Sequence, residues 1–426
     1  MADVRPIPAL YFDPARVESI EAVIAPPYDV IDPEQRQALL ARSSHNVVEI
    51  DLPESPDGGD RYAHAAATMR EWREQGVLTT DPEPTLWGLT QAYTAPDGSS
   101  HERHAILARV GAEEYGAGRV RPHERTQPGP KQDRLDLTRA TGHNLSPIFS
   151  LTSVDAWPLL EPATDDVPWA ETVDPDGTVN RVWRVTDPAI HAAVAETLAS
   201  AELLIADGHH RYETARTFAA EVEAERDGAD GGSDAHRFTL MALTGLEDPG
   251  LTVFPTHRLL KGLDAEQLEA LEGRLGEAFE MTPVEADRID PADAEEGPGV
   301  LGYTDARRGR HFLLRLRDRA GLDRALSDRS AAYRDLDAVV LETLVLREML
   351  GMSEDDIAAK RGIGYAKSLA ELRTRLDTDE YQAGFVLRPT PVEAVRKVAA
   401  AGETMPPKST YFYPKIPTGL VFNPVR

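Results

Sequence analysis

The segment Glu202–Arg226 most constrains the fold, because an apolar strand passes into a long helix through a single glycine. Its central run, LIADGHHRYETA, occupies residues 204–215. The pattern predicts a short buried strand over Glu202–Ala206 and a helix from about Tyr212 to Arg226. Gly208 allows a tight turn and a close approach of the backbone to a ligand. The chain as a whole is therefore expected to be α+β, or mixed α/β.

The residues of this turn favour a site for anions. A helix N-terminus offers N–H groups and the positive end of its dipole. Arg211 adds a fork of donors suited to phosphate or carboxylate. Asp207 would accept a proton or hold Mg²⁺, and His209 and His210 titrate near neutrality. A purely structural interpretation remains open, in which Asp207 is a helix N-cap and one histidine belongs to the core.

A second candidate is the basic loop 119–144, RVRPHERTQPGPKQDRLDLTRATGHN. Six Lys or Arg residues and three acids give it a local charge of +3, in a chain whose formal charge is −26. This contrast indicates a loop that faces anions. Glu124, between His123 and Arg125, would serve as a base or a metal ligand. The alternative is a solvated loop with ordinary ion pairs.

A third candidate is the C-terminal tail, where Lys408 and Lys415 are two of only seven lysines. The tail superficially resembles a Walker A loop, but Pro407 stands where the glycine before the lysine is required. We expect either a tail that lends Lys408 to an anion site or an edge strand held by its aromatic residues. A further hypothesis places Tyr28 and Asp29, which follow a double proline, at the same cleft.

Composition narrows the classes of protein. The 72 acidic residues outnumber the 46 basic ones, which disfavours nucleic acid and anionic membranes as partners. Cysteine is absent, which excludes disulfides, zinc–thiolate sites and a thiol nucleophile. The N-terminus lacks the pattern of a signal peptide, and no apolar run is long enough to span a membrane. A soluble, cytoplasmic protein is expected.

Three regions are predicted along the chain. Residues 1–150 form an N-terminal α/β region with the basic loop, residues 151–260 the core with the Asp-Gly-His-His-Arg motif, and residues 261–426 a C-terminal α/β region whose tail returns to the core. Other predicted elements include a helix from Asp32 to about Ala41, a strand over Val47–Leu52, a hairpin of Leu86–Thr94 with Arg103–Val110, and a core helix over Leu336–Leu350.

Residues 206–215 resemble the hallmark of an uncharacterised bacterial and archaeal family, called in words the domain of unknown function one thousand and fifteen. The resemblance runs over nearly the whole chain. It includes Ala25–Val30, His123–Thr126 with Lys131 and Arg134, Ser146–Phe149, Pro255–Arg258 and Met405–Lys415. This family brings no settled function with it.

The Asp-Gly-His-His-Arg stretch is also similar to the motif of the ParB/sulfiredoxin-like superfamily, which includes free serine kinases. That resemblance implies a ParB/sulfiredoxin-like core around residues 202–226. It also implies Asp207 as catalytic base, with His209, His210 and Arg211 holding phosphates. Those kinases use a glutamate as well, and Glu124 is the candidate here although its motif does not match.

The function expected is that of a small-molecule phosphotransferase, a kinase of free serine or a related hydroxylated metabolite. It would use Mg²⁺ with ATP or ADP. Asp207, Glu124 and His209 are the catalytic candidates. The nucleotide- or phosphate-binding candidates are Gly208, His210, Arg211, Arg125, Thr126, Lys131, Arg134 and Lys408. The alternatives are a non-catalytic regulator that binds a nucleotide or metabolite, and a nuclease or phosphatase, which the acidic charge disfavours. The oligomeric state is left open.

Overall fold

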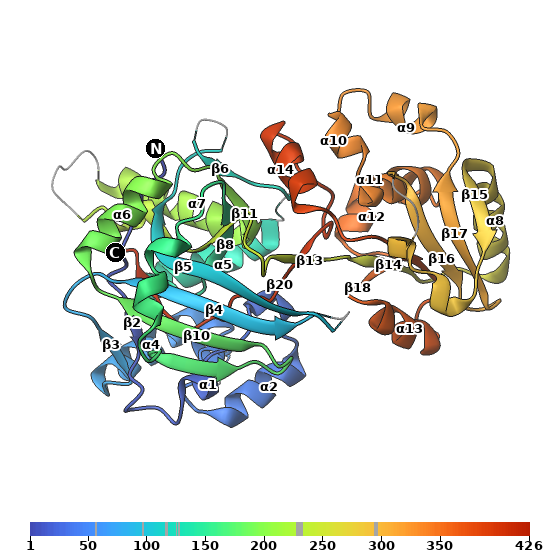
Figure 1. Cartoon of the computed structure of the whole chain (residues 1–426). Helices are drawn as coiled ribbons and strands as arrows, with labels where there is room; N and C mark the ends of the chain where they lie inside the picture. Colours follow the sequence, from blue (N-terminus) through green and yellow to red (C-terminus); the bar gives the residue numbers. More distant parts are fainter. Residues whose placement is uncertain are drawn as a thin grey trace. The chain divides into compact units, whose positions relative to one another are not determined.

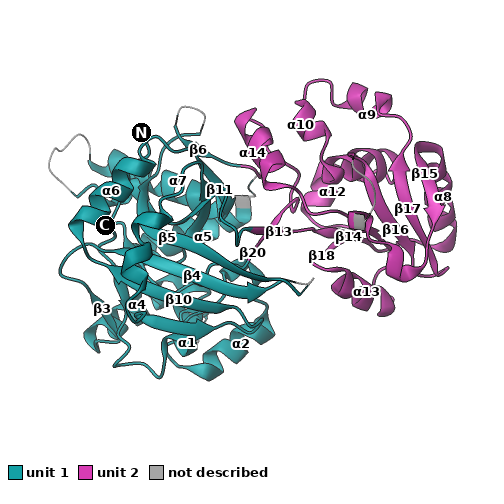
Figure 2. Cartoon of the chain, in the orientation of Figure 1, with its two compact units in different colours: residues 1–122, 126–251, 414–426 teal, residues 123–125, 252–413 magenta. Residues whose placement is uncertain are grey.

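The computed structural model describes the chain except for residues 56–57, 96–97, 116–117, 125, 127, 227–232 and 294–296 (Figure 1). The side chains of residues 128 and 293 are also outside the description. The chain forms two compact units (Figure 2). Unit 1 comprises residues 1–122, 126–251 and 414–426, and unit 2 comprises residues 123–125 and 252–413. These boundaries differ from the three regions expected from the sequence.

Unit 1 is built on a nine-stranded mixed sheet in the order β6-β11-β8-β12-β5-β4-β10-β9, with β1 also pairing with β5. The β11–β6 and β12–β8 pairs are parallel, and the other pairs are antiparallel. The strands are β1 Val4–Arg5, β4 Leu86–Thr94, β5 Ser100–Gly111, β6 Val120–Arg121, β8 Ile148–Thr152, β9 Ala170–Val173, β10 Val179–Val185, β11 Leu203–Asp207 and β12 Phe238–Gly245. This large mixed sheet confirms the mixed α/β class.

The central strand β12 of this sheet is buried along its whole length. Such burial is expected for a strand with neighbours on both edges and side chains packed on both faces. β4 and β5 form the predicted antiparallel hairpin, with Leu89 opposite Ala105. Two smaller pairs complete the strands of unit 1: β2 Leu10–Phe12 with β3 Leu78–Thr80, and β7 His143–Asn144 with β21 Asn423–Pro424.

The helices of unit 1 begin where the sequence offers caps. Asp32 and Gln35 form a capping box at the start of α2, and Pro33 occupies its first turn, as predicted. The side chains of Asp60 and Asp187 cap α4 and α6 by accepting hydrogen bonds from backbone N–H groups of the first turn. The helices are α1 Ile20–Val23, α2 Pro33–Arg42, α3 Val48–Asp51, α4 Arg61–Glu74, α5 Pro128–Thr141, α6 Pro188–Leu198 and α7 His209–Arg226, with short 3-10 helices at Tyr28–Val30, Trp157–Leu159, Glu161–Thr164 and Ala235–Arg237.

Two local predictions in unit 1 were wrong. The segment Val47–Leu52 is not a strand, because it contains the helix α3. The buried side chain of Asn46 accepts a hydrogen bond from the Val48 N–H and donates to the carbonyls of Ala22 and Ile24, which fixes the chain for a helical turn. Helix α7 also begins at His209, three residues earlier than predicted, so Asp207 ends the strand β11.

Unit 2 is built on a six-stranded antiparallel sheet in the order β15-β17-β16-β19-β14-β18. Its strands are β14 His257–Leu260, β15 Phe279–Pro283, β16 Val300–Asp305, β17 Arg310–Leu316, β18 Ile363–Ala366 and β19 Ala383–Val386. A separate two-stranded ribbon pairs β13 Thr252–Phe254 with β20 Tyr411–Tyr413.

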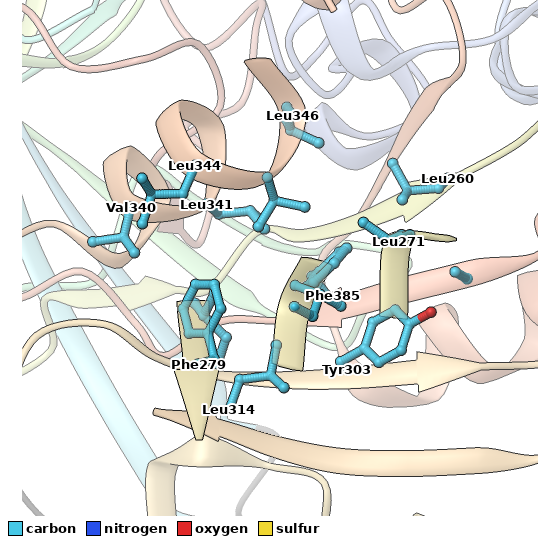
Figure 3. Close-up of a cluster of buried hydrophobic side chains, with 14 of the residues drawn as sticks. Leu260, Leu271, Phe279, Tyr303, Leu314, Val340, Leu341, Leu344, Leu346 and Phe385 are labelled. Carbon is cyan, nitrogen blue, oxygen red and sulfur yellow. The ribbon is translucent and has the colours of Figure 1, made fainter. Parts of the chain in front are cut away.

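The core of unit 2 packs helices against this sheet (Figure 3). Phe279, Tyr303 and Phe385 from the strands meet Leu271 of α8 and Leu344 from the helical segment predicted over Leu336–Leu350. That segment is core, as predicted, but α11 Asp337–Val340 continues as a π-helix over Leu341–Met349. The remaining helices are α8 Ala265–Ala278, α9 Ala320–Ala325, α10 Ala331–Arg334, α12 Glu354–Ala358, α13 Leu369–Asp377 and α14 Val392–Ala400, with 3-10 turns at Ala286–Arg288 and Pro291–Asp293.

Candidate functional site

The Asp-Gly-His-His-Arg motif forms a tight turn between β11 and α7 in unit 1. Asp207 is the last residue of β11, and Gly208 has a φ of +95°, a conformation that costs other residues steric strain. A Cβ at Gly208 would lie 2.9 Å from the Nε and Nη2 atoms of Arg211. Glycine is therefore required here both by the backbone and by the arginine packed over it.

The carboxylate of Asp207 lies between two cations. The Nζ of Lys415 donates to its Oδ1 atom at 2.7 Å, and the Nη2 of Arg211 donates to its Oδ2 atom at 2.8 Å. The side chains of Asp207, Lys415 and Arg211 are only 18%, 16% and 10% exposed. Weak solvent screening strengthens these ion pairs. We call Asp207, Arg211 and Lys415 the charged triad.

Arg211 also ties the start of α7 to the loop that precedes β8. Its Nη1 atom donates to the Oγ of Ser146 at 2.6 Å and to the carbonyl of Pro147. Its Nε atom is buried, and no hydrogen-bond partner is found for it among the described residues. The guanidinium is thus held in one orientation by contacts within the protein.

A second set of charges lies close to the triad. Arg134 of α5 is buried, and its Nη1 atom donates to the Oδ1 of Asp51 at 3.0 Å and to the Asp51 carbonyl at 2.8 Å. Its guanidinium lies 4.2 Å from the centre of the Tyr28 ring. Burial lowers the pKa of Arg134, but the charges of Asp51 and Asp133 more than offset this, so the pKa is raised and the side chain stays cationic.

Tyr28 also lies within electrostatic reach of the triad. Burial raises the pKa of its hydroxyl to about 12, while the charge of Arg211 opposes that rise. A small polar cavity of about 30 Å³ is lined by Arg134, Arg211, Asp51 and Ser146, among others. This volume suits one or two water molecules and is far too small for a nucleotide.

Two further sequence candidates converge on Glu213 of α7. Thr126 donates from Oγ1 to its Oε1 atom at 2.9 Å, and the Nζ of Lys131 donates to its Oε2 atom at 2.8 Å. His209 is buried and His210 is half-buried in the first turn of α7. Arg125 lies outside the described residues.

Glu124 and Lys408 belong to unit 2, where the structure brings them together. Met405 donates its N–H to the His123 carbonyl at 2.7 Å, and the Lys408 N–H donates to the Oε1 of Glu124 at 3.3 Å. Lys408 has a left-handed φ of +59° and an exposed side chain. Because Asp207 belongs to unit 1, a site that joins it to Glu124 and Lys408 stays a prediction.

A buried arginine accompanies Glu124 in unit 2. Arg258 is 3% exposed, and its guanidinium lies 4.7 Å from the centre of the Tyr365 ring. Burial lowers the pKa of Arg258, and the charges of Tyr365, Glu342 and Glu124 oppose that change. Glu124 is therefore part of a group of interacting charges in unit 2, and its role as a base or metal ligand stays a prediction.

Sequence reasoning missed three residues of the unit 1 cluster: Lys415, Ser146 and Asp51. Lys415 was noticed as one of two lysines in the tail, but Lys408 was preferred for the anion site. The scarcity of lysine and the family resemblance over Met405–Lys415 were the signals available for it. Ser146 was marked only as part of the family resemblance over Ser146–Phe149, and nothing local marks Asp51; each meets its partner only through the fold.

The described part of the chain contains neither a candidate metal-binding cluster nor a candidate membrane-spanning helix. No group of three or more His, Cys, Asp or Glu side chains is placed to hold a metal ion there. Within the same residues, no helix is long and apolar enough to cross a membrane.

The fold and the triad define a mixed α/β protein with a partly buried, charged site at a strand–glycine–helix turn. The chain belongs to the family described as "Protein of unknown function (DUF1015)", whose model matches residues 4–339. The family resemblance expected from the motifs is thereby confirmed. No curated protein matches the chain.

Solved structures that resemble the chain have low sequence identity to it. A free serine kinase in complex with AMP is 14% identical, covering 74% of this chain and 92% of that chain, with a TM-score of 0.36. A conserved hypothetical protein from Pyrococcus furiosus is 16% identical, with coverages of 74% and 95% and a TM-score of 0.36. C-terminally truncated SbnI from Staphylococcus aureus is 11% identical, with coverages of 74% and 85% and a TM-score of 0.36. Neither nucleotide binding nor kinase activity follows for this chain from similarity at this level.

Proposed function

We propose that the protein is a small-molecule phosphotransferase, a kinase that transfers phosphate from ATP or ADP to the hydroxyl of serine or a related metabolite. The observation that carries the proposal is the charged triad, in which Asp207 is fixed between Arg211 and Lys415 at the start of α7. The ParB/sulfiredoxin-like core and a cytoplasmic location, both expected from the sequence, belong to the same proposal.

The triad suits an anionic substrate. Two cations and one carboxylate leave a net charge of +1 in a poorly solvated place, and the positive end of the α7 dipole adds to it. Phosphoryl transfer depends mainly on positioning and on neutralising the charge of the phosphates. Lys415 and the first turn of α7, with Gly208, His209 and His210, are the groups we assign to the phosphates.

Asp207 would act as the base. In the proposed step the substrate hydroxyl oxygen attacks the terminal phosphorus, and the bond to the leaving phosphate oxygen breaks. The nucleotide keeps that electron pair, and the hydroxyl proton passes to a carboxylate oxygen of Asp207. The two cations stabilise the carboxylate and so weaken it as a base. They also hold it in one orientation, and a loose transition state needs the proton removed only late.

The residues present fit a nucleotide phosphate better than a protein-bound metal. Both carboxylate oxygens of Asp207 already accept from a cation, and a positive neighbourhood opposes Mg²⁺. Mg²⁺ usually keeps several waters and binds through substrate phosphates with one or two carboxylates. We therefore assign any Mg²⁺ to the nucleotide and derive no step from it. Thr126, Lys131, Arg134 and Lys408 remain proposed binding residues, and Glu124 remains a proposed catalytic residue.

A second candidate function is a nucleotide- or metabolite-binding regulator without catalysis. It is favoured by the engagement of Arg211, whose Nη1 and Nη2 atoms already donate to Ser146, Pro147 and Asp207. A guanidinium whose donors are already bonded within the protein would stabilise the fold more than it would bind a substrate.

The deciding experiment incubates the full chain with ATP or ADP, Mg²⁺ and a pool of hydroxylated amino acids led by serine, and follows products by phosphorus NMR. A new phosphomonoester signal is expected from the wild type and is expected to disappear in Asp207→Asn. The matched control is Glu221→Gln, which makes the same chemical change in a more exposed ion pair with Arg139. The assay runs below the unfolding midpoint of each variant, as checked by circular dichroism.

Each outcome decides between the candidates. Turnover that survives in Asp207→Asn would remove this residue as the base. Nucleotide-dependent thermal stabilisation without turnover would establish the regulator instead. If neither turnover nor nucleotide-dependent stabilisation is observed, both proposed functions are overturned.

A further inference from the structure

Unit 2 contains a cavity of about 310 Å³ that plays no part in the proposed phosphotransferase. It opens beside the ends of β14 and β18, between α8 and the last turn of the π-helix that ends at Met349. Ala270 of α8 lies in its wall.

The floor of this cavity is apolar. Leu260 and Leu271 are buried members of the core cluster drawn in Figure 3, and Leu263, Met349 and Met352 pack against that cluster. Leucine and methionine side chains form a surface that adapts to an aliphatic partner, because the thioether chain has several accessible rotamers. The floor therefore suits a flexible hydrocarbon body.

The polar part of the lining is cationic. Lys261, Arg274 and Arg361 line the cavity, and no carboxylate does so among the described residues. This is unusual in a chain with 72 acidic and 46 basic residues. The absence of lining acids leaves a positive potential over an apolar floor.

The three cations are not neutralised equally. Lys261 pairs with Glu380 at 3.6 Å and Arg361 with Asp356 at 2.7 Å. The four side chains are between 33% and 61% exposed, so water screens both pairs and weakens them. Arg274 has no carboxylate within ion-pair distance among the described residues. Its Nη1 atom donates to the Met349 carbonyl, which holds the guanidinium at the wall of the cavity with other donors left over.

We propose that this cavity binds a medium-chain fatty-acid carboxylate. The carboxylate would pair with Arg274, Lys261 and Arg361, and the chain would lie on the leucine and methionine floor. At roughly 30 Å³ for each heavy atom, the share of one molecule in liquid water, 310 Å³ holds about ten heavy atoms. Octanoate has this size, and a charged head on an aliphatic body matches both parts of the lining.

The proposal is tested by calorimetric titration of the full chain with octanoate, and with octanol as the uncharged comparison. Saturable one-to-one binding of octanoate is expected, with octanol at least about tenfold weaker. Affinity is expected to rise about fourfold for each methylene from hexanoate to octanoate, as for a buried methylene, and to level off beyond octanoate as the cavity fills.

Three variants test the contacts of the carboxylate separately from the contacts of the hydrocarbon chain with the apolar floor. Arg274→Met is expected to weaken octanoate binding about five- to tenfold and to leave octanol unchanged. Ala270→Trp fills the cavity and is expected to abolish binding of both. Arg315→Met removes an exposed arginine from β17, outside the lining, and is the control expected to change neither.

A readout on the wild type keeps the test independent of variant folding. The chain has only seven methionines, so carbon-13 labelling of their methyl groups gives a spectrum that is simple to assign. Octanoate is expected to shift the Met349 and Met352 signals and to leave the Met69 and Met241 signals in place. Equal affinity for octanol, binding that survives Ala270→Trp, or shifts that miss Met349 and Met352 would each overturn the proposal.

Discussion

Replacing Asp207 by asparagine tests the charged triad as a physical unit. The change keeps the size of the side chain and removes the negative charge between Arg211 and Lys415. Two cations with 10% and 16% exposed side chains then face each other without a carboxylate. Breaking a buried ion pair costs about 3–5 kcal/mol. Because these side chains keep some contact with water, we expect a loss of about 3 kcal/mol.

The loss would be measured as a change in the unfolding midpoint. For a unit of this size, 1 kcal/mol shifts the midpoint by about 2–4 °C, so Asp207→Asn is expected to unfold about 6–12 °C below the wild type. The control Glu221→Gln affects an ion pair whose side chains are 39% and 35% exposed and is expected to cost less than about 1 kcal/mol.

An added anion gives the sharper part of this test. In Asp207→Asn the two cations lack their counter-charge, so inorganic phosphate is expected to raise the midpoint of the variant more than that of the wild type. Chloride at equal ionic strength controls for screening. The reasoning is refuted if Asp207→Asn matches Glu221→Gln in stability, or if phosphate stabilises the variant and the wild type equally.

Three further predictions concern stability. Gly208 has a φ of +95° and an added Cβ would lie 2.9 Å from Arg211, whereas Gly177 has a similar φ of +86° and open space around an added Cβ. In denaturant titrations, Gly208→Ala is therefore expected to lower the free energy of unfolding by at least about 1 kcal/mol more than Gly177→Ala. Equal losses would contradict the contact with Arg211. Burial raises the pKa of the Asp174 carboxyl to about 6, so the folded state holds this proton more tightly than the unfolded state and its contribution to stability is lost as pH rises from about 4 to 6. Asp174→Asn is expected to flatten that part of the pH–stability curve, and an unchanged slope would count against it. Burial, followed by the charge of Arg258, lowers the pKa of His257 to about 4. The contribution of the neutral imidazole to stability is therefore lost as pH falls from about 6.5 to 4. In acid unfolding experiments His257→Gln is expected to remove that loss, and a variant that loses stability over this range as the wild type does would contradict the lowered pKa.

Several elements were determined by the sequence alone. The capping box of Asp32 and Gln35 set the start of α2, and Gly208 set the turn between β11 and α7. Two strand-like runs close together in the sequence set the hairpin of β4 and β5. At the start of α2 and at the Gly208 turn, residues a few positions apart supply both the conformational preference and the partner that satisfies it. The motif residues Asp207 and Arg211, four positions apart, form an ion pair within this turn.

The rest was decided by tertiary structure. Lys415 reaches Asp207 across 208 positions of the chain, and Ser146 reaches Arg211 across 65. No local pattern encodes such a pair, because it forms only when separate strands and loops have packed. Tertiary contacts also decide the conformation of Val47–Leu52, whose apolar residues suit a strand or a helix equally. The helix forms because the buried Asn46 side chain donates to the carbonyls of Ala22 and Ile24. Local preference thus placed the motif, and long-range packing chose which cations surround its carboxylate.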